Sequence, residues 1–223
     1  MTVRRVDFAQ IKPGRLQEYV EVFNDMKEAM SAIIAPTVRL MLINHGENGP
    51  ANLTTGHCYS VVDFDSAAAY GEFMNAARED EGIQKVWRQI NSAESPIVHR
   101  GSGLLHQIEA GGATAPDQDG SVAFVRAWKI APGMMEVARA AGAVMNKHAE
   151  ASGGHYQVMR PMVSPSSGPN VIVSFTFPDW TGLGAFLDEV NDNPEIQQVA
   201  ESFRSATPPG VILGAGIATR IAS

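Results

Sequence analysis

The chain contains an internal repeat, because its two halves carry the same order of glycines, prolines and apolar residues. Ile11-Lys12-Pro13-Gly14 recurs as Ile130-Ala131-Pro132-Gly133. After a short deletion in the second half, the matched pairs are Phe64 with Phe177, Gly71 with Gly184, Phe73 with Phe186, Ile83-Gln84 with Ile196-Gln197, Pro96 with Pro209, Gly101 with Gly214, Gly103 with Gly216 and Ile108 with Ile221. A repeat this long indicates a duplicated domain. Functional features are therefore expected where the two copies differ.

Charge and cysteine content exclude several classes of function. The formal net charge of −7 argues against binding to nucleic acid or to an anionic membrane, since both need clustered Lys and Arg. No uninterrupted apolar run is long enough to cross a bilayer, and the strand-like segment 3–11 is preceded by no signal-peptide hydrophobic region. The single cysteine, Cys58, excludes an intramolecular disulfide. We expect a cytoplasmic protein.

Each copy shows the order strand, helix, strand, strand, helix, strand. The first copy is predicted to contain strands at 3–11, 38–43, 59–64 and 97–108, a helix from Leu16, and a second helix after Asp65-Ser66 that breaks near Gly82. The second copy is predicted to contain strands at 124–130, 156–163, 171–177 and 211–221, with helices at 134–151 and after Asp179. The predicted organisation is a first repeat at 1–108, a linker at 109–120 and a second repeat at 121–223.

The βαββαβ order is that of a ferredoxin-like unit. The opening strand–Lys12-Pro13-Gly14–helix and the helix interrupted at Asn193-Pro194-Glu195-Ile196-Gln197 resemble the dimeric α+β barrel superfamily. That superfamily includes the antibiotic-biosynthesis monooxygenases, the stress-responsive barrels and the NIPSNAP-like proteins. The resemblance covers nearly the whole chain, once in each copy. It implies an α+β fold in which two tandem ferredoxin-like repeats form an intramolecular dimeric α+β barrel, as a monomeric pseudo-dimer or a homodimer of it.

Alternation along the strand at 57–64 separates two faces. One face carries Cys58, Ser60, Val62 and Phe64, and its counterpart in the second copy is apolar, so this face is predicted to lie beneath helices. The other face carries His57, Tyr59, Val61 and Asp63. If the barrel forms, this polar face points toward its interior.

Histidines are the strongest asymmetry between the copies, because each of the six has a different residue at the matching position. None occurs in a ligand spacing such as His-x-His, so we expect no metal. His57 beside Tyr59 on one strand face is the best acid–base candidate, and His155 is the runner-up. A surface or satisfied polar histidine remains the more common alternative.

The first strands carry opposite charges at matching positions, Asp7 and Arg126. This pair predicts a salt bridge across the internal two-fold axis, either as a structural pin or as part of a ligand site. Arg126 is also a candidate to stabilise an oxyanion beside His57 and Tyr59. The further candidates for contact with substrate are Asp7, Asp63, Trp128, His155 and Arg160.

Two classes of function follow. The resemblance implies a small-molecule enzyme, namely a cofactor-independent monooxygenase or an acid–base catalyst acting on an apolar aromatic or polyketide-like substrate. No bound organic cofactor is expected, and the Asn, Trp and His set of haem-degrading relatives does not map onto these strands. The alternative is a non-catalytic ligand-binding or stress-associated barrel whose polar interior is structural. An open cavity on which His57, Tyr59 and Asp63 converge would favour the enzyme, whereas a closed and fully hydrogen-bonded network of these groups, or a dry barrel closed by Asp7 and Arg126, would favour the structural role.

Overall fold

The computed structural model describes residues 2–34, 37–47, 57–163 and 167–222, which form two βαββαβ repeats. The first repeat comprises β1 (Val3–Ile11), α1 (Leu16–Ser31), β2 (Thr37–Glu47), β3 (His57–Phe64), α2 (Ala67–Glu79), α3 (Glu81–Ile90) and β4 (Ile97–Gly112). The second comprises β5 (Val122–Ile130), α4 (Met135–Ala151), β6 (His155–Pro161), β7 (Val171–Phe177), α5 (Trp180–Asp192), α6 (Pro194–Arg204) and β8 (Gly210–Ala222). The predicted tandem architecture is confirmed.

Polar side chains start the helices where the sequence pattern places them. Ser66 Oγ accepts a hydrogen bond from the backbone N–H of Ala69 at 3.0 Å, and Asp179 Oδ1 accepts one from Gly182 at 3.0 Å. After each interruption a second helix begins, and its N-terminus is also capped. Asp80 caps α3, and Asn193 caps α6. Each cap satisfies a backbone donor that the first turn of a helix leaves without a partner.

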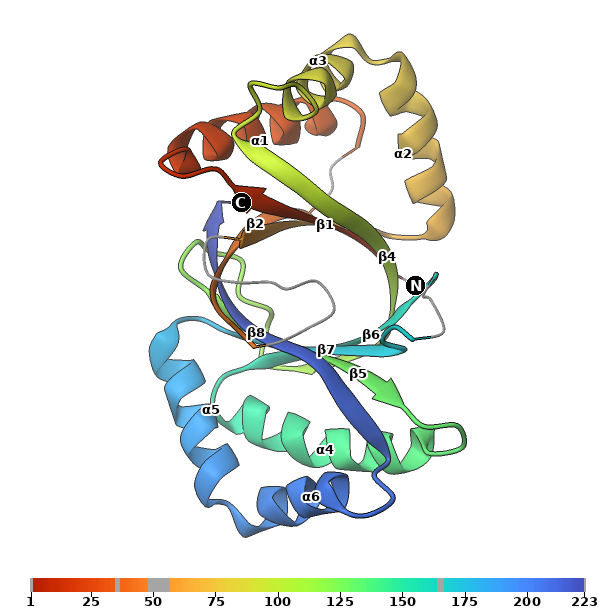
Figure 1. The fold of residues 1–223 in the computed structure, drawn as a ribbon, viewed down its shortest axis with the longest axis vertical. Coiled ribbons are helices and arrows are strands. Elements are labelled where there is room, and N and C mark those ends of the chain that lie inside the picture. Colours follow the sequence, from red (N-terminus) through yellow and green to blue (C-terminus); the bar gives the residue numbers. More distant parts are fainter. Residues whose placement is uncertain (1, 35–36, 48–56, 164–166, 223) are drawn as a thin grey trace.

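The eight strands form one closed barrel in the order β1-β3-β2-β8-β5-β7-β6-β4. Each repeat contributes four adjacent strands, and two antiparallel seams, β2 with β8 and β4 with β6, join the repeats. Figure 1 shows the barrel between two helical layers, with α1, α2 and α3 on one side and α4, α5 and α6 on the other. Closure pairs the strand edges that would otherwise remain exposed.

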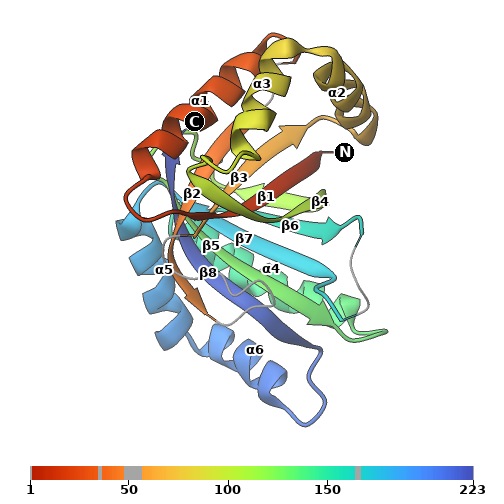
Figure 2. The ribbon, with the colours of Figure 1, turned by 45° about the horizontal axis from the view of Figure 1, so that its top comes forward.

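Two apolar cores lie between the sheets and their helices, and each is built around a matched pair of phenylalanines. In the first repeat Phe64 packs on Phe73, with ring centroids 5.4 Å apart. In the second repeat Phe177 packs on Phe186, also at 5.4 Å. Figure 2 shows the strands between these helical layers from a second direction. The buried face of β3 is the one that alternation predicted, since Cys58 and Phe64 belong to the first core.

The strand β4 is longer than predicted, because it continues past Ile108 to Gly112. Its first part pairs with β1 of its own repeat, and its second part pairs with β6 of the other repeat, where Glu109 faces Val158 and Gly112 faces His155. The first four residues of the predicted linker are therefore strand. Among the described residues, no helix is long and apolar enough to cross a membrane.

Candidate functional site

A cavity of about 590 Å³ lies in the second repeat, between the sheet and the helices α4 and α6. Its walls come from the outward faces of β5 and β7, from the inner faces of these helices, and from the end of β4. This volume falls within the range of small-molecule sites. We call it the helix–sheet cavity.

The second repeat has a cavity at this place because two aromatic side chains of the first repeat have small counterparts in the second. In the first repeat, α1 places Tyr19 and Phe23 against the sheet, and these side chains are only 6% and 5% exposed. The matching positions of α4 are Ala138 and Gly142, and both line the helix–sheet cavity. A Cβ atom built on Gly142 meets no described atom within 4 Å beyond its chain neighbours and the backbone of its own helix. The second copy has the same helix but lacks the side chains that fill the space beneath it in the first copy.

Polar groups enter this apolar cavity from three different elements. Arg126 projects from β5, Asn146 from α4 and Glu109 from β4. Asn146 is buried, and its Nδ2 donates a long hydrogen bond of 3.4 Å to Glu109 Oε1. Within the part of the chain that the structure describes, Asn146 Oδ1 accepts no hydrogen bond. A buried acceptor left in this state is suited to a donor on a ligand.

Tyr156 on β6 sits beside the Glu109–Asn146 pair. Burial, together with the charge and hydrogen bonding of Glu109, raises the pKa of the Tyr156 phenol, while a hydrogen bond with Asn146 opposes that rise. The phenol is therefore neutral at physiological pH. It can donate to the carboxylate of Glu109, which keeps that group oriented at the edge of the cavity.

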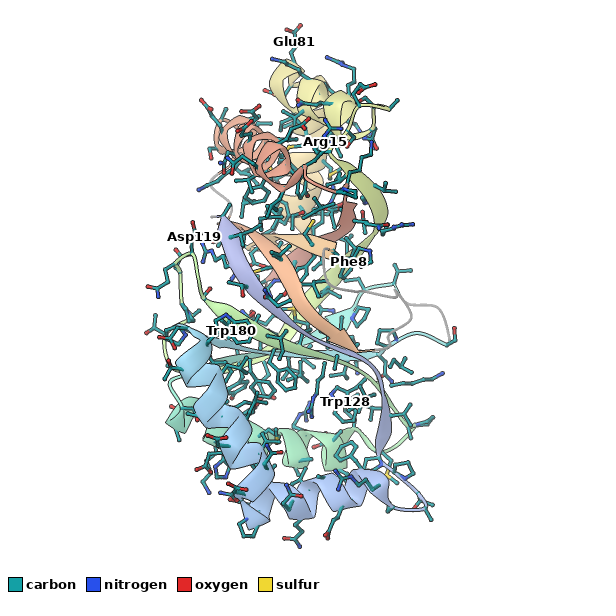
Figure 3. All side chains as sticks on the ribbon, turned by 60° about the vertical axis from the view of Figure 1, so that its left-hand side comes forward. Phe8, Arg15, Glu81, Asp119, Trp128 and Trp180 are labelled. Atoms are coloured by element: carbon teal, nitrogen blue, oxygen red, sulfur yellow. The ribbon has the colours of Figure 1, made fainter. Side chains whose placement is uncertain are left out.

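Aromatic rings form another wall of the cavity. Trp128 on β5 packs against Phe203 on α6, with ring centroids 4.9 Å apart and planes inclined by 57°. Figure 3 shows Trp128 between the sheet and the helices of the second repeat. The Arg126 guanidinium lies 4.6 Å from the centroid of the Phe124 ring, in a cation–π arrangement. The cavity therefore combines flat apolar surfaces with a positive charge on its sheet side.

Haem does not fit these residues. Among the described residues that line the cavity there is no histidine, cysteine or tyrosine, which are common ligands of haem iron in enzymes. The nearby His148 on α4 is buried, with Nδ1 3.1 Å from Glu189 and Nε2 3.3 Å from Glu195. Both ring nitrogens are engaged by carboxylates, so His148 is a structural tie between α4 and the helices α5 and α6.

The face of β3 that was predicted to point inward does so. Tyr59 and Val61 line a second cavity, inside the barrel. Asp63 accepts two hydrogen bonds from Arg4, at 2.6 and 2.8 Å, and one from Arg39. Burial acts to raise the pKa of Asp63, but hydrogen bonds and charge from the two arginines outweigh it and hold that pKa below its ordinary value. Asp63 is thus an ionised structural partner inside the barrel.

The predicted salt bridge between Asp7 and Arg126 is wrong. Asp7 accepts hydrogen bonds from Arg5 at 2.8 and 3.0 Å, and it also bonds Ser102. Asp7 lies on the helix side of β1, whereas Arg126 lies on the helix side of β5. Because each faces away from the barrel, the barrel and both its walls lie between them, and these two matching positions do not meet.

The expected grouping of His57, Tyr59 and Arg126 in one site is also wrong. Tyr59 faces the barrel interior and Arg126 faces the helix–sheet cavity, on opposite sides of the barrel wall. His57 is buried at the first position of β3, where it pairs with Gln10 of β1. Burial, followed by the charge of Arg100, lowers the pKa of His57. A neutral imidazole is suited to a base, but His57 lines neither of these two cavities.

Two other candidates lie away from both cavities. His155 Nδ1 is 3.0 Å from the carbonyl oxygen of Ala113, which fixes the chain just after β4. Arg160 is exposed on β6. Of the predicted substrate contacts, Trp128 alone joins Arg126 in the helix–sheet cavity.

Sequence reasoning missed Glu109 and Asn146. The sequence pattern predicts a linker at Glu109, because its position in a strand follows only from pairing with the other repeat. Asn146 aligns with Lys27 of the first copy, so a comparison of the first helices would have detected the change. The same comparison shows Tyr19 and Phe23 replaced by small residues, which was the available signal for the cavity.

Known proteins resemble this chain in structure. The sequence matches no protein-family model and no curated protein. A Fusobacterium nucleatum protein described as a putative monooxygenase has a TM-score of 0.64 at 10% identity, over 99% of this chain and 91% of that chain. A chlorite dismutase mutant from Candidatus Nitrospira defluvii has a TM-score of 0.56 at 8% identity, over 99% and 91%. An anthrone oxidase-like protein has a TM-score of 0.56 at 8% identity, over 99% and 92%.

These likenesses extend along nearly the whole of each chain, so they concern the complete two-repeat architecture rather than one shared motif. At such low identity they show the fold alone. The chain has the coarse α+β barrel fold of proteins named as monooxygenases and chlorite dismutases.

Proposed function

We propose that this protein is a small-molecule enzyme that deprotonates or oxygenates an apolar aromatic or polyketide-like substrate in the helix–sheet cavity. The observation that carries the proposal is the convergence of Arg126, Asn146 and Glu109 on a largely apolar space of about 590 Å³, whose rim also includes Arg139, Asn191, Gln197 and Arg204. A structural barrel has no need of such a void, since unfilled space costs stability.

The three polar groups are suited to one sequence of proton movements. The Glu109 carboxylate accepts a proton from an acidic carbon or a phenol of the substrate. The anion that results is stabilised by the positive charge of Arg126, while Asn146 Oδ1 accepts a hydrogen bond from a hydroxyl elsewhere on the substrate. In an oxygenation this anion reacts with O₂, so that a CH₂ group becomes a carbonyl and O₂ is reduced to water. No metal or organic cofactor is required for either outcome.

The solved structures that resemble this chain support the proposed reaction but do not identify its substrate. Proteins named as a putative monooxygenase and as anthrone oxidase-like share the complete fold. Trp128 and Phe203 offer flat surfaces to an aromatic ring. The proposed substrate is accordingly a polycyclic phenol or anthrone, with its acidic position directed toward Glu109.

Turnover of anthrone and polyphenols, followed by O₂ uptake and by the absorbance of the quinone product, tests the proposal. We expect Arg126→Gln and Glu109→Gln each to lower kcat/KM by a factor of about 100 or more, since each removes a charge used in the transition state. Arg160→Gln, an exposed arginine outside the cavity, is the matched control and should keep wild-type turnover.

His57→Ala is the second control, because His57 lies outside the cavity. It should leave turnover unchanged. Tight binding of these aromatic compounds without turnover would instead assign the protein to the non-catalytic, ligand-binding class. Equal kcat/KM values for wild type and both cavity variants would remove the proposed roles of Arg126 and Glu109.

A further inference from the structure

A second cavity, of about 310 Å³, lies inside the barrel, separated from the helix–sheet cavity by the barrel wall. Most of its lining is apolar, including Val6, Phe8, Tyr59 and Ile172. Phe8 and Tyr59 stand with ring centroids 6.0 Å apart. Barrels of eight strands have room inside for side chains alone or for one small ligand.

Three arginines, Arg4, Arg39 and Arg220, line this apolar cavity. Arg4 donates two hydrogen bonds to Asp63 and one, at 2.8 Å, to Gln157. Arg39 shares that same Asp63 carboxylate. One inward carboxylate therefore serves two guanidinium groups, which leaves an excess positive charge in a poorly solvated place.

Arg220 is 3% exposed and takes its counter-charges from outside the barrel wall. Its Nη2 is 2.8 Å from Asp117 Oδ1 and its Nε is 3.7 Å from Asp119 Oδ1. Both aspartates belong to the segment between the repeats, and their side chains are 77% and 57% exposed. Figure 3 shows Asp119 at the margin of the barrel.

The buried Nε atoms of Arg39 and Arg220 have no hydrogen-bond partner among the described residues. Buried polar groups are normally hydrogen-bonded, and an arginine is costly to bury without full pairing. Two such donors at the edge of one apolar cavity are the arrangement expected for an absent acceptor that carries negative charge.

We propose that the barrel interior binds an apolar organic monoanion, an aromatic carboxylate, with its carboxylate at Arg39 and Arg220 and its ring beside Phe8 and Tyr59. The pKa values agree with this placement. Burial, then the charge of Arg4, lowers the pKa of Arg39, although Asp63 opposes the shift. An added negative charge would relieve this repulsion. The inference concerns a different cavity from the proposed catalytic one and does not rest on that function.

The segment between the repeats lies at the arginine end of this site. Pro116 lines the cavity, and its carbonyl accepts a hydrogen bond of 3.4 Å from Arg220. The next residue, Asp117, places a carboxylate on Arg220, where it competes with the carboxylate of a ligand. Because Asp117 is exposed, its replacement leaves the core untouched.

Isothermal titration calorimetry with naphthalene-2-carboxylate, and with the neutral naphthalene-2-carboxamide as its matched probe, tests the proposal on the whole chain. We expect wild type to prefer the carboxylate. Arg39→Gln should weaken carboxylate binding about tenfold or more and leave carboxamide binding unchanged, since it removes a charge-assisted hydrogen bond. Asp63 keeps both bonds from Arg4 in this variant.

Asp117→Asn provides a test that does not perturb the core. It removes the competing charge, so carboxylate binding should tighten severalfold, with no change for the carboxamide. Gly142→Phe, which fills the helix–sheet cavity, should retain carboxylate binding. Loss of binding in Gly142→Phe would place the ligand in the other cavity and overturn the proposal. So would carboxylate affinities that neither Arg39→Gln nor Asp117→Asn changes.

Discussion

Gly142 is the position at which one substitution can close the helix–sheet cavity. Its counterpart Phe23 is 5% exposed in the first repeat, so a phenylalanine side chain fits this place on an equivalent helix and sheet. At Gly142 itself a Cβ points into open space, with no heavy atom within 4 Å. We expect Gly142→Phe to reproduce the packing of the first repeat and to exclude the proposed substrate.

The magnitude has two favourable parts and one cost. Replacing a helix-interior glycine with phenylalanine gains about 0.5 kcal/mol in helix propensity. Burying the ring gains about 2–3 kcal/mol, and fixing its rotamer costs about 0.5–1 kcal/mol. The free energy of unfolding should therefore rise by about 2 kcal/mol, which for a chain of 223 residues corresponds to an increase in Tm of about 4–8 °C.

Thermal and urea unfolding followed by circular dichroism measure this gain, and the turnover assay measures the loss of function. Gly142→Ala is the matched control, because it supplies the helix propensity, about 1 kcal/mol, without filling the cavity. Gain of stability with loss of turnover is the trade-off expected at a functional void. The reasoning would be refuted by a Gly142→Phe variant that is less stable than Gly142→Ala, or that turns over substrate at the wild-type rate.

Three further predictions concern stability. Phe23→Ala should lower the free energy of unfolding by about 3–5 kcal/mol in urea titrations, because it opens in the first repeat the void that the second has. Asp63→Asn should cost about 3–5 kcal/mol, since it leaves Arg4 and Arg39 without their charge partner. Because the pKa of Asp63 is lowered on folding, wild type should also lose stability as pH falls below about 3.8, and an Asp63→Asn variant that loses as much stability as wild type over this pH range would contradict it. Because the pKa of His57 is lowered in the folded protein, the unfolded chain binds a proton at this side chain more readily. Wild-type stability should therefore fall as pH drops below about 6.5. Thermal unfolding of His57→Gln should lack this part of the pH dependence.

The fold could be predicted from the sequence because its signals are local and occur twice. Alternation along β3 separated Tyr59 from Cys58, and Asp179 marked the start of a helix. Each signal depends on neighbours within a few residues, which is the range over which strand pleating and helix capping operate. The same pattern at the matching positions of the second copy supports the prediction of each helix and strand independently.

The candidate site could be predicted only in part. Trp128 and Arg126 were selected because they differ from Ala9 and Asp7, and both line the helix–sheet cavity. The partners expected for Arg126 were wrong, because alternation assigns a residue to a face without showing which sheet that face opposes. Asp7 and Arg126 both face helices, so the barrel separates them.

By itself, the sequence determined that two ferredoxin-like units are joined in one chain and which residues share a strand face. Tertiary structure alone decided which residues meet. Glu109 reaches the second repeat because β4 crosses the seam and pairs with β6, and Gly142 opens a void because no other described element fills the space of the missing ring. Periodicity is a property of neighbouring residues, whereas a cavity is defined by distant side chains and by the volume that they leave empty.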